Sequence, residues 1–161
     1  AHHLREVAIA LSAEYANRFA AYPAVERLTH GRYRAVGQEL SQTMGGSSGV
    51  LLAIFFAAAG DASAGGADTV GALLAGLDRI RQVGGAKTGD RTMIDAMEPA
   101  LAALPGGLAA AAAAARAGAD RTAGIGRAKA GRASYISEAK LAGHNDPGAE
   151  AVALLLERLG G

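Results

Sequence analysis

The sequence lacks cysteine and tryptophan, and only 4% of its 161 residues are aromatic. Without cysteine the chain forms no disulfides and no thiolate metal sites, and this composition fits a cytoplasmic protein. Half of the residues are hydrophobic. We therefore expect a core of Ala, Leu, Val and Ile, whose small side chains let helices approach one another closely.

A strong charge of one sign is also missing, because 16 basic and 15 acidic residues leave a formal net charge of +1. This balance gives no electrostatic reason to expect a nucleic-acid partner. The longest apolar stretch, residues 50–59, is too short to cross a bilayer, and no secretory signal pattern is visible. We therefore expect a cytoplasmic protein with no membrane partner.

Strand patterns are missing as well, since no segment alternates β-branched and polar residues between turns. Apolar residues recur at helical spacing instead, which predicts an all-α protein. The segment 48–59 is apolar all round, so central burial is expected for it, and 61–68 is expected to form a loop. The predicted helices contain Leu4–Leu11, Val25–Leu40 (broken or joined near Thr29–Gly31), Ser48–Ala59, Thr69–Ile80, a helix from Gly89 or Asp90 through Met97 with a kink at Pro99, Leu108–Ala117 and Asp146–Leu159.

Small and polar residues gather at the starts of several of these helices. A helix start has free backbone N–H groups and the positive end of the helix dipole, so it attracts anions. Asp146 and Pro147 form the strongest start signal, as N-cap and first helical residue. Together the starts predict a phosphate or nucleotide site. The segments concerned are Met44–Gly49, Gly89–Met93, Gly131–Tyr135 and His144–Ala149.

The first segment has alternative interpretations. Gly45–Gly49 matches the G-x-S-x-G elbow of serine hydrolases, with Ser47 as nucleophile. That elbow needs a preceding strand and a surrounding sheet, and neither is expected here. A phosphate cradle and a plain turn between two helices both remain open.

The other polar residues also have structural interpretations. The segment 84–90 is not a Walker A loop, because its lysine does not follow the last glycine. Asp90 is typical of a helix cap, and Asp95 with Glu98 is typical of a solvated pair on one helix face. Arg132 suits either a phosphate or the open surface, and His144 either a ligand or loop packing.

In combination the segments resemble a known family. The motifs M-G-G-S-S-G, G-D-R-T-M-I-D-A-M-E-P-A, G-R-A-S-Y and D-P-G-A occur in this order and spacing. They resemble the nucleotide-binding L domain of dihydroxyacetone kinases, from near Gly37 to Leu159. We expect residues 1–161 to be one helical domain. Because the chain begins at Ala1 rather than Met, we also expect that it is processed, tagged or cut from a longer kinase.

The resemblance implies a closed antiparallel barrel of about eight helices, with ADP or ATP at one end. It also implies that the domain donates a phosphoryl group to a small ketose held by a partner K domain, and has no catalytic residue of its own. The Ser-Ser form of the first motif resembles the ATP-dependent kinases of the family. The implied nucleotide contacts are Gly46, Ser47 and Ser48 at the phosphates, Gly84, Thr92 and Met93 around the nucleotide, and Arg132, Asp146, Pro147 and Gly148 closing the site.

One departure concerns the metal. The family carries an early G-D-x-D-x-G loop whose aspartates hold Mg²⁺, whereas no aspartate precedes Asp61 here. Glu14 and Glu26 are the only acidic residues between Leu11 and Gly37, so no metal ligand is assigned. Either a stretch is missing from the sequence at this point, or the chain is a degenerate helical module that binds or regulates without catalysis.

Overall fold

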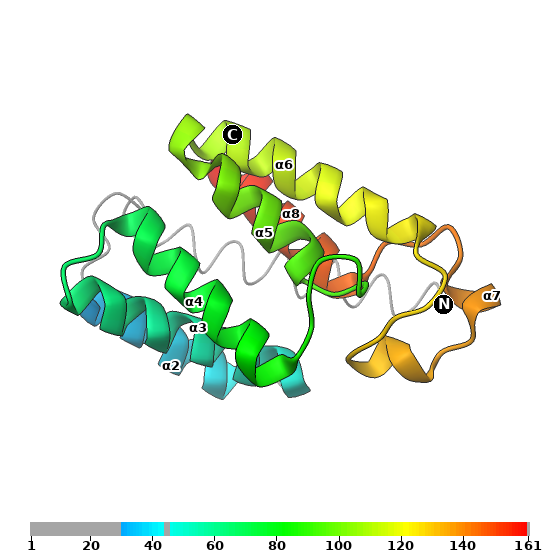
Figure 1. The fold of residues 1–161 in the computed structure, drawn as a ribbon, viewed down its shortest axis with the longest axis horizontal. Coiled ribbons are helices and arrows are strands. Elements are labelled where there is room, and N and C mark those ends of the chain that lie inside the picture. The colour runs from blue at the N-terminus through cyan, green and yellow to red at the C-terminus, as the bar shows by residue number, and fades with distance from the viewer. Residues whose placement is uncertain (1–29, 44–45, 161) are drawn as a thin grey trace. The chain divides into compact units, whose positions relative to one another are not determined.

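The computed structural model describes residues 30–43 and 46–160, and every regular element in that part of the chain is helical (Figure 1). The all-α prediction is confirmed, but the predicted number of eight helices is not, because the described residues contain seven α-helices, α2–α8. The helix predicted at Leu4–Leu11 lies outside the described residues. The chain divides into two compact units, with the boundary along the described sequence between Gly85 and Ala86, and each unit is described separately below.

The first unit contains α2 (His30–Thr43), α3 (Gly46–Ala64) and α4 (Thr69–Gly84). α3 packs against both α2 and α4 (Figure 1). Glycine on each neighbour lets the backbones approach: a Cβ at Gly76 would lie 2.6 Å from the Phe55 carbonyl oxygen, and one at Gly37 would lie 3.1 Å from that of Ala53. Phe55 and Phe56 are buried between them, with ring centroids 5.0 Å apart.

Two expectations about α3 were wrong. It continues to Ala64, so the predicted loop 61–68 shrinks to 65–68, and Arg34 of α2 pairs with Asp61 at 2.5 Å. Its burial is one-sided rather than central, since Val50 is 59% exposed. At 19 residues it is the one helix in the described part that could cross a membrane by length and composition alone. Within its unit, α3 packs on α2 and α4 through the close backbone contacts at Gly37 and Gly76.

The helix α4 follows the sequence closely. It begins at Thr69 as predicted, with the Asp68 carboxylate accepting a hydrogen bond from the Gly71 N–H at 2.7 Å. It ends at Gly85, whose φ of 67° is the left-handed conformation that favours glycine, and whose N–H donates to the Arg81 carbonyl.

The second unit contains α5 (Ile94–Ala103), α6 (Leu108–Arg121), α7 (Glu138–Leu141) and α8 (Pro147–Gly160), with short 3₁₀ turns η2 (Leu104–Gly106), η3 (Thr122–Gly124) and η4 (Arg132–Tyr135). The centre of its core is built of alanine, one of the four residue types that the composition predicted for the core. α6 packs on α5 and α8, and a Cβ at Gly118 would lie 2.2 Å from the Asp95 carbonyl oxygen. The central residues are Ala96, Ala100, Ala115, Ala119, Ala149 and Ala153.

Helix boundaries in this unit were predicted unevenly. α6 includes the alanine run, and α8 begins at Pro147, both as expected. α5 begins at Ile94, four residues later than Asp90, because residues 89–93 form a loop held by side-chain hydrogen bonds. The helix continues through Pro99 to Ala103.

Candidate functional site

The glycine–serine segment lies at the start of α3. Gly46 has a φ of 78°, and Ser47 and Ser48 occupy the first turn, where backbone N–H groups have no partner within the helix. Met44 and Gly45 lie outside the described residues. The first unit also brings Gly84 close, since a Cβ there would lie 3.6 Å from Leu51, one turn after the serines. Both ends meet at one edge of the α3–α4 pair.

Asp95 organises the loop that precedes α5. Its carboxylate accepts hydrogen bonds from the backbone N–H of Gly89 at 2.6 Å and of Thr92 at 2.8 Å. The side chain is 4% exposed, so the prediction of a solvated carboxylate pair was wrong. Its partner in that prediction, Glu98, accepts a hydrogen bond from the Thr88 hydroxyl.

Asp90 had been predicted to cap a helix, but it does not cap α5. Its carboxylate accepts the Lys87 N–H at 2.9 Å and pairs with the Lys129 ammonium at 3.1 Å. The hydrogen bond from Lys87 and the nearby Lys129 hold the pKa of Asp90 below its usual value, despite burial. The Lys129 N–H also donates to the Asp90 carbonyl. Asp90 therefore joins the loop before α5 to the segment that leads into η4.

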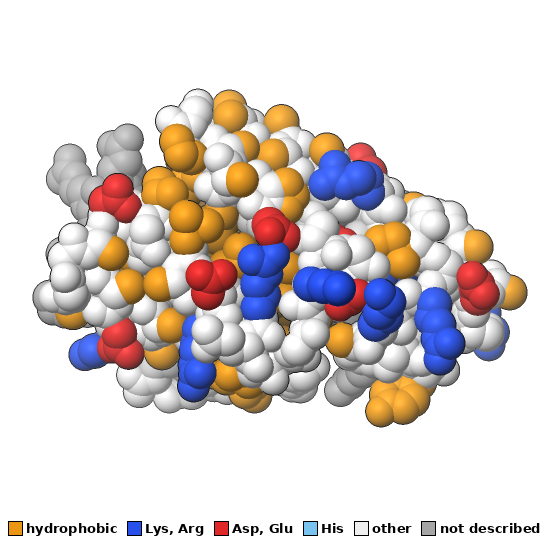
Figure 2. Space-filling view, viewed as in Figure 1, with side chains coloured by type: hydrophobic (Ala, Val, Ile, Leu, Met, Phe, Trp, Pro, Cys, Tyr) orange, Lys and Arg blue, Asp and Glu red, His pale blue; other side chains and the backbone are white. Residues whose placement is uncertain are grey.

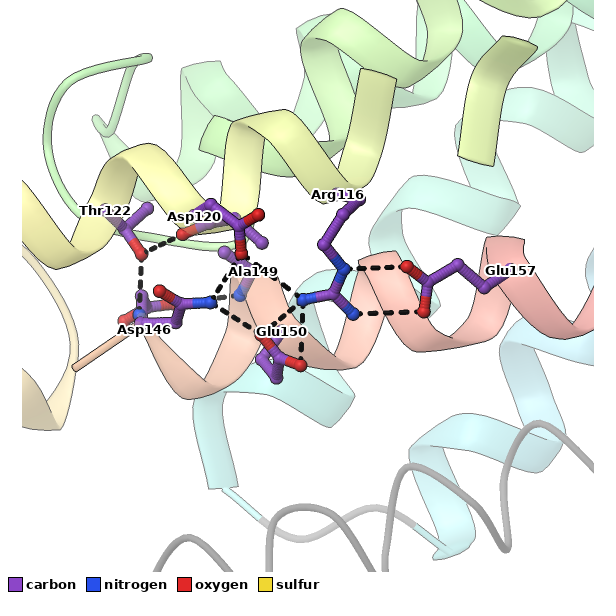
Figure 3. Close-up of polar contacts among 9 residues, drawn as sticks. Arg116, Asp120, Thr122, Asp146, Ala149, Glu150 and Glu157 are labelled. Atoms are coloured by element: carbon purple, nitrogen blue, oxygen red, sulfur yellow. Dashed lines mark hydrogen bonds and ion pairs between the residues drawn. The ribbon is translucent and has the colours of Figure 1, made fainter. Parts of the chain in front are cut away.

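The start of α8 is tied to the end of α6 through the buried residue Asp146 (Figure 3). The Asp146 carboxylate accepts the Ala149 N–H at 3.0 Å, which makes it the predicted N-cap. The Asp146 N–H in turn donates to the Thr122 hydroxyl at 2.7 Å. Burial raises the pKa of Asp146, although hydrogen bonding to Ala149 and the positive charge of Arg91 oppose the rise.

Gly148 joins this start to the loop before α5. A Cβ on Gly148 would lie 3.3 Å from the Met93 Cβ and 3.4 Å from the Met93 nitrogen. Any larger residue would have to push the two segments apart. The second unit therefore brings Thr92, Met93, Asp146, Pro147 and Gly148 together, as a single site requires.

Arg116 clamps α6 to α8 behind that start (Figure 3). Its guanidinium binds both carboxylate oxygens of Glu157 at 2.7 and 3.0 Å and both of Glu150 at 2.8 and 2.9 Å. The pKa of Arg116 is raised, and the hydrogen bonds to Glu157 contribute most to that rise. Burial alone would raise the pKa of Glu150, but hydrogen bonds from Arg116 and Asn145 outweigh it and lower that pKa.

Arg132 is the first residue of η4, directly after Gly131 with its φ of 71°, and its side chain is outside what the structure describes. Figure 2 shows Lys and Arg side chains gathered on the surface over η4 and α7, at the right of the view. Exposed cations of this segment are Arg127, Lys129 and Lys140. Such a surface favours an anionic ligand.

His144 contributes its backbone rather than its ring. The His144 carbonyl accepts a hydrogen bond from Arg91, while the side chain is exposed.

A Mg²⁺ site does not fit the described residues. They contain no group of three or more His, Asp or Glu side chains that could hold a metal ion. The two carboxylates nearest to Thr92, those of Asp90 and Asp95, already accept backbone N–H groups. No step that depends on a metal follows from this arrangement.

Sequence reasoning missed Asp95, Arg91 and Thr122. The spacing Thr92-Met93-Ile94-Asp95 is that of a capping box, a signal that could have predicted the Asp95–Thr92 hydrogen bond. Nothing in the sequence marks Arg91 as buried, and only its contacts reveal that it is.

The matching family is the DAK2 domain, which covers residues 24–161. The chain is 50% identical over 130 residues to a dihydroxyacetone kinase of Citrobacter freundii, covering 79% of this chain and 24% of that protein. It is 38% identical over 154 residues to an L-erythrulose 1-kinase of Mycolicibacterium smegmatis, covering 88% and 27%. The chain therefore spans about a quarter of the length of these curated relatives.

Solved structures agree with these relatives. The native crystal structure of the C. freundii dihydroxyacetone kinase matches with a TM-score of 0.68 and 45% identity, covering 81% of this chain and 23% of that one. The structure of the same kinase in complex with AMP-PNP and Mg²⁺ matches with a TM-score of 0.66 and 43% identity, covering 81% and 22%.

Proposed function

This chain belongs to the DAK2 domain family, and from that premise we propose that it is the nucleotide-binding L-type domain of a dihydroxyacetone-type kinase. In this proposal residues 1–161 are one domain, completed as a closed barrel of about eight helices. It binds ADP or ATP and passes a phosphoryl group to a small ketose held by a K domain. The chain is active as a kinase only together with that K domain, in the cytoplasm.

The observation that carries the proposal is the junction of Met93 with Gly148. Two motifs separated by more than fifty residues are held within a Cβ contact of each other, beside the capped start of a 14-residue helix. The backbone N–H groups of this helix start that the Asp146 cap leaves free attract anions. A relative with 43% identity was solved with AMP-PNP and Mg²⁺, which supports a nucleotide as the ligand.

The proposal gives each site residue the role that the family resemblance implies. Gly46, Ser47 and Ser48 offer N–H and hydroxyl donors to phosphates at the start of α3. Gly84, Thr92 and Met93 surround the nucleotide, with Met93 near the base. Arg132 and the turn Asp146-Pro147-Gly148 close the site. Catalysis is then a matter of positioning and charge neutralisation, without a covalent intermediate on this chain.

A second candidate is a degenerate helical module that binds a partner, or nucleotide weakly. The observation that favours it is the shortage of metal ligands: no aspartate precedes Asp61, and the described residues hold no metal cluster. Mg²⁺ neutralises phosphate charge in kinases when it is bound. The two candidates therefore differ in whether nucleotide binding depends on Mg²⁺.

Calorimetry with ADP separates the candidates. Tight binding with Mg²⁺ that is lost in EDTA is the result expected of the kinase domain, and weak binding that is insensitive to EDTA supports the degenerate module. No binding in either condition overturns the nucleotide proposal. Phosphoryl transfer to dihydroxyacetone on adding a K domain, above that of K domain alone, is the second expected result.

The double variant Ser47→Ala, Ser48→Ala tests the phosphate role. Removing hydroxyl donors to a charged group is expected to weaken ADP binding by about tenfold. Ser63→Ala, in the last turn of the same helix, is the matched control and is expected to bind like the wild type. Equal affinities of all three proteins would contradict the assignment of the serines.

A further inference from the structure

Arg91 is the most deeply buried charged side chain among the described residues. It is 1% exposed, and it is the one non-glycine residue there with a positive φ, at 62°. A buried cation is costly unless its donors are satisfied, and a left-handed conformation adds strain for a side chain with a Cβ. A residue held in this way against both costs is fixed by its surroundings.

The surroundings are three backbone carbonyls. The Arg91 Nε donates to the Thr122 carbonyl at 3.2 Å, and Nη2 donates to the carbonyls of Leu141 at 3.1 Å and His144 at 2.6 Å. These acceptors lie 31, 50 and 53 residues further along the chain. A single guanidinium thus fastens the loop before α5 to the end of α6 and to the segment before α8.

The bonds of Arg91 continue into the proposed site on both sides. On one side, Thr122 accepts Arg91 at its carbonyl and Asp146 at its hydroxyl, and Asp146 caps α8. On the other side, Thr92 and Met93 directly follow Arg91, and Met93 packs on Gly148. The two candidate halves of the nucleotide site are therefore tied to the same side chain.

The Nε and Nη2 atoms of this arginine donate to the chain itself, Nη1 is buried without a hydrogen-bond partner, and the side chain is 1% exposed, so the contacts of Arg91 in this structure are with the chain. Lysine cannot replace it, since an ammonium group is a point charge without the planar fork that reaches separate acceptors.

We propose that Arg91 is a positioning residue that sets the separation between Thr92-Met93 and Pro147-Gly148, and thereby the affinity for the nucleotide. The proposal rests on the proposed function for its effect on binding. Its structural half, the placement of the α8 start by Arg91, is independent of any ligand.

The test uses Arg91→Gly and Arg91→Lys in the full chain, with Arg158→Gly, an exposed arginine in the last turn of α8 in the same unit, as control. Glycine accepts the positive φ but removes the whole buried side chain, whereas lysine keeps the aliphatic stem and the charge and loses only the guanidinium fork. Loss of charged hydrogen bonds is expected to weaken ADP binding by at least tenfold in both Arg91 variants, and not in the control. Methylguanidinium, but not methylammonium, is expected to restore part of the affinity of Arg91→Gly.

Amide hydrogen exchange supplies the readout that needs no nucleotide. Faster exchange is expected at 144–149 in both Arg91 variants, with the α5–α6 core unchanged. If wild-type protein binds no ADP, the proposed function fails, while the exchange data still decide the role of Arg91. Unchanged exchange at 144–149, uniformly faster exchange throughout the unit, or no response to methylguanidinium overturns the positioning role.

Discussion

At the scale of a single residue, two effects act in opposite directions on the Asp146 carboxylate. Its carboxylate caps α8, which favours an acceptor at that position, but it is only 6% exposed, which disfavours the charge. Burial accordingly raises its pKa. The cap, rather than the negative charge, is the part of this side chain that stabilises the fold.

Asp146→Asn and Asp146→Ala separate the two demands. Asparagine keeps an acceptor for the Ala149 N–H, so we expect the Asn variant to unfold in urea at neutral pH with at least wild-type stability. Alanine loses the cap, at a cost of about 1 kcal/mol. The corresponding changes at Asp68, an exposed N-cap of α4, are the control, where Asn and wild type should be equal. An Asn variant as unstable as the Ala variant would show that the charge itself is needed.

Sequence reasoning reached the residues of the site unevenly. The cap at Asp146 was predictable, because capping depends on neighbours in sequence. Asp95 could have been found from its capping-box spacing. Arg91 could not, because its three acceptors are distant in sequence and are backbone carbonyls, which leave no mark on residue types.

At the scale of helices, Gly118 decides how closely α5 and α6 pack. A Cβ there would lie 2.2 Å from the Asp95 carbonyl oxygen and 2.9 Å from the Ala96 Cα, which are both backbone atoms. Backbone cannot move aside as the end of a flexible side chain can. The contact therefore requires glycine for its lack of volume.

Gly118→Ala is expected to destabilise the second unit by roughly 1–3 kcal/mol through overpacking, even though alanine is the better helix former. Gly124→Ala is the matched control, because a Cβ at Gly124 meets nothing within 4 Å. Thermal and urea unfolding measure both. Equal stability of the two variants would mean that α5 and α6 are packed less closely than described.

The positions of helices were largely predictable, and their ends were less so. Start and stop residues fixed α4 and α8, since caps act locally. The end of α3 was wrong because Asp61 and Ser63 are common in loops, and only the ion pair with Arg34 across to α2 shows why the helix continues. The prediction that α3 is buried on all sides also failed. The apolar residues of a helix do not show which of its sides a neighbouring helix covers.

At the scale of the whole molecule, acid stability depends on carboxyls with opposite shifts. The pKa of Glu150 is lowered from a usual 4.5 and that of Asp90 from 3.8, so both stabilise the fold above these values and lose that contribution as the pH falls through the lowered pKa. The pKa of Asp146 is raised, so its contribution is full below 3.8 and is lost as the pH rises through the raised value.

We therefore expect the free energy of unfolding to fall between about pH 5 and about pH 2, and Glu150→Gln to flatten that fall. Asp146→Asn is expected to steepen it slightly, because Asp146 is the one carboxyl of the described residues whose pKa is shifted upward. Urea titrations across this range measure all three proteins. A Glu150→Gln profile parallel to that of the wild type would contradict the role given to the Arg116 clamp.

The seven alanines of α6, Ala109–Ala115, act as a spacer whose length matters as well as the small size of its buried residues Ala111, Ala112 and Ala115. Each residue turns a helix by about 100°, so one alanine more or fewer would rotate Arg116 away from Glu157 relative to the start of the helix, and Gly118 away from Asp95. A repeat of identical residues would thus tolerate many single exchanges on its exposed side but no change of count. The number of alanines in this stretch therefore fixes the direction in which Arg116 and Gly118 point from the helix axis.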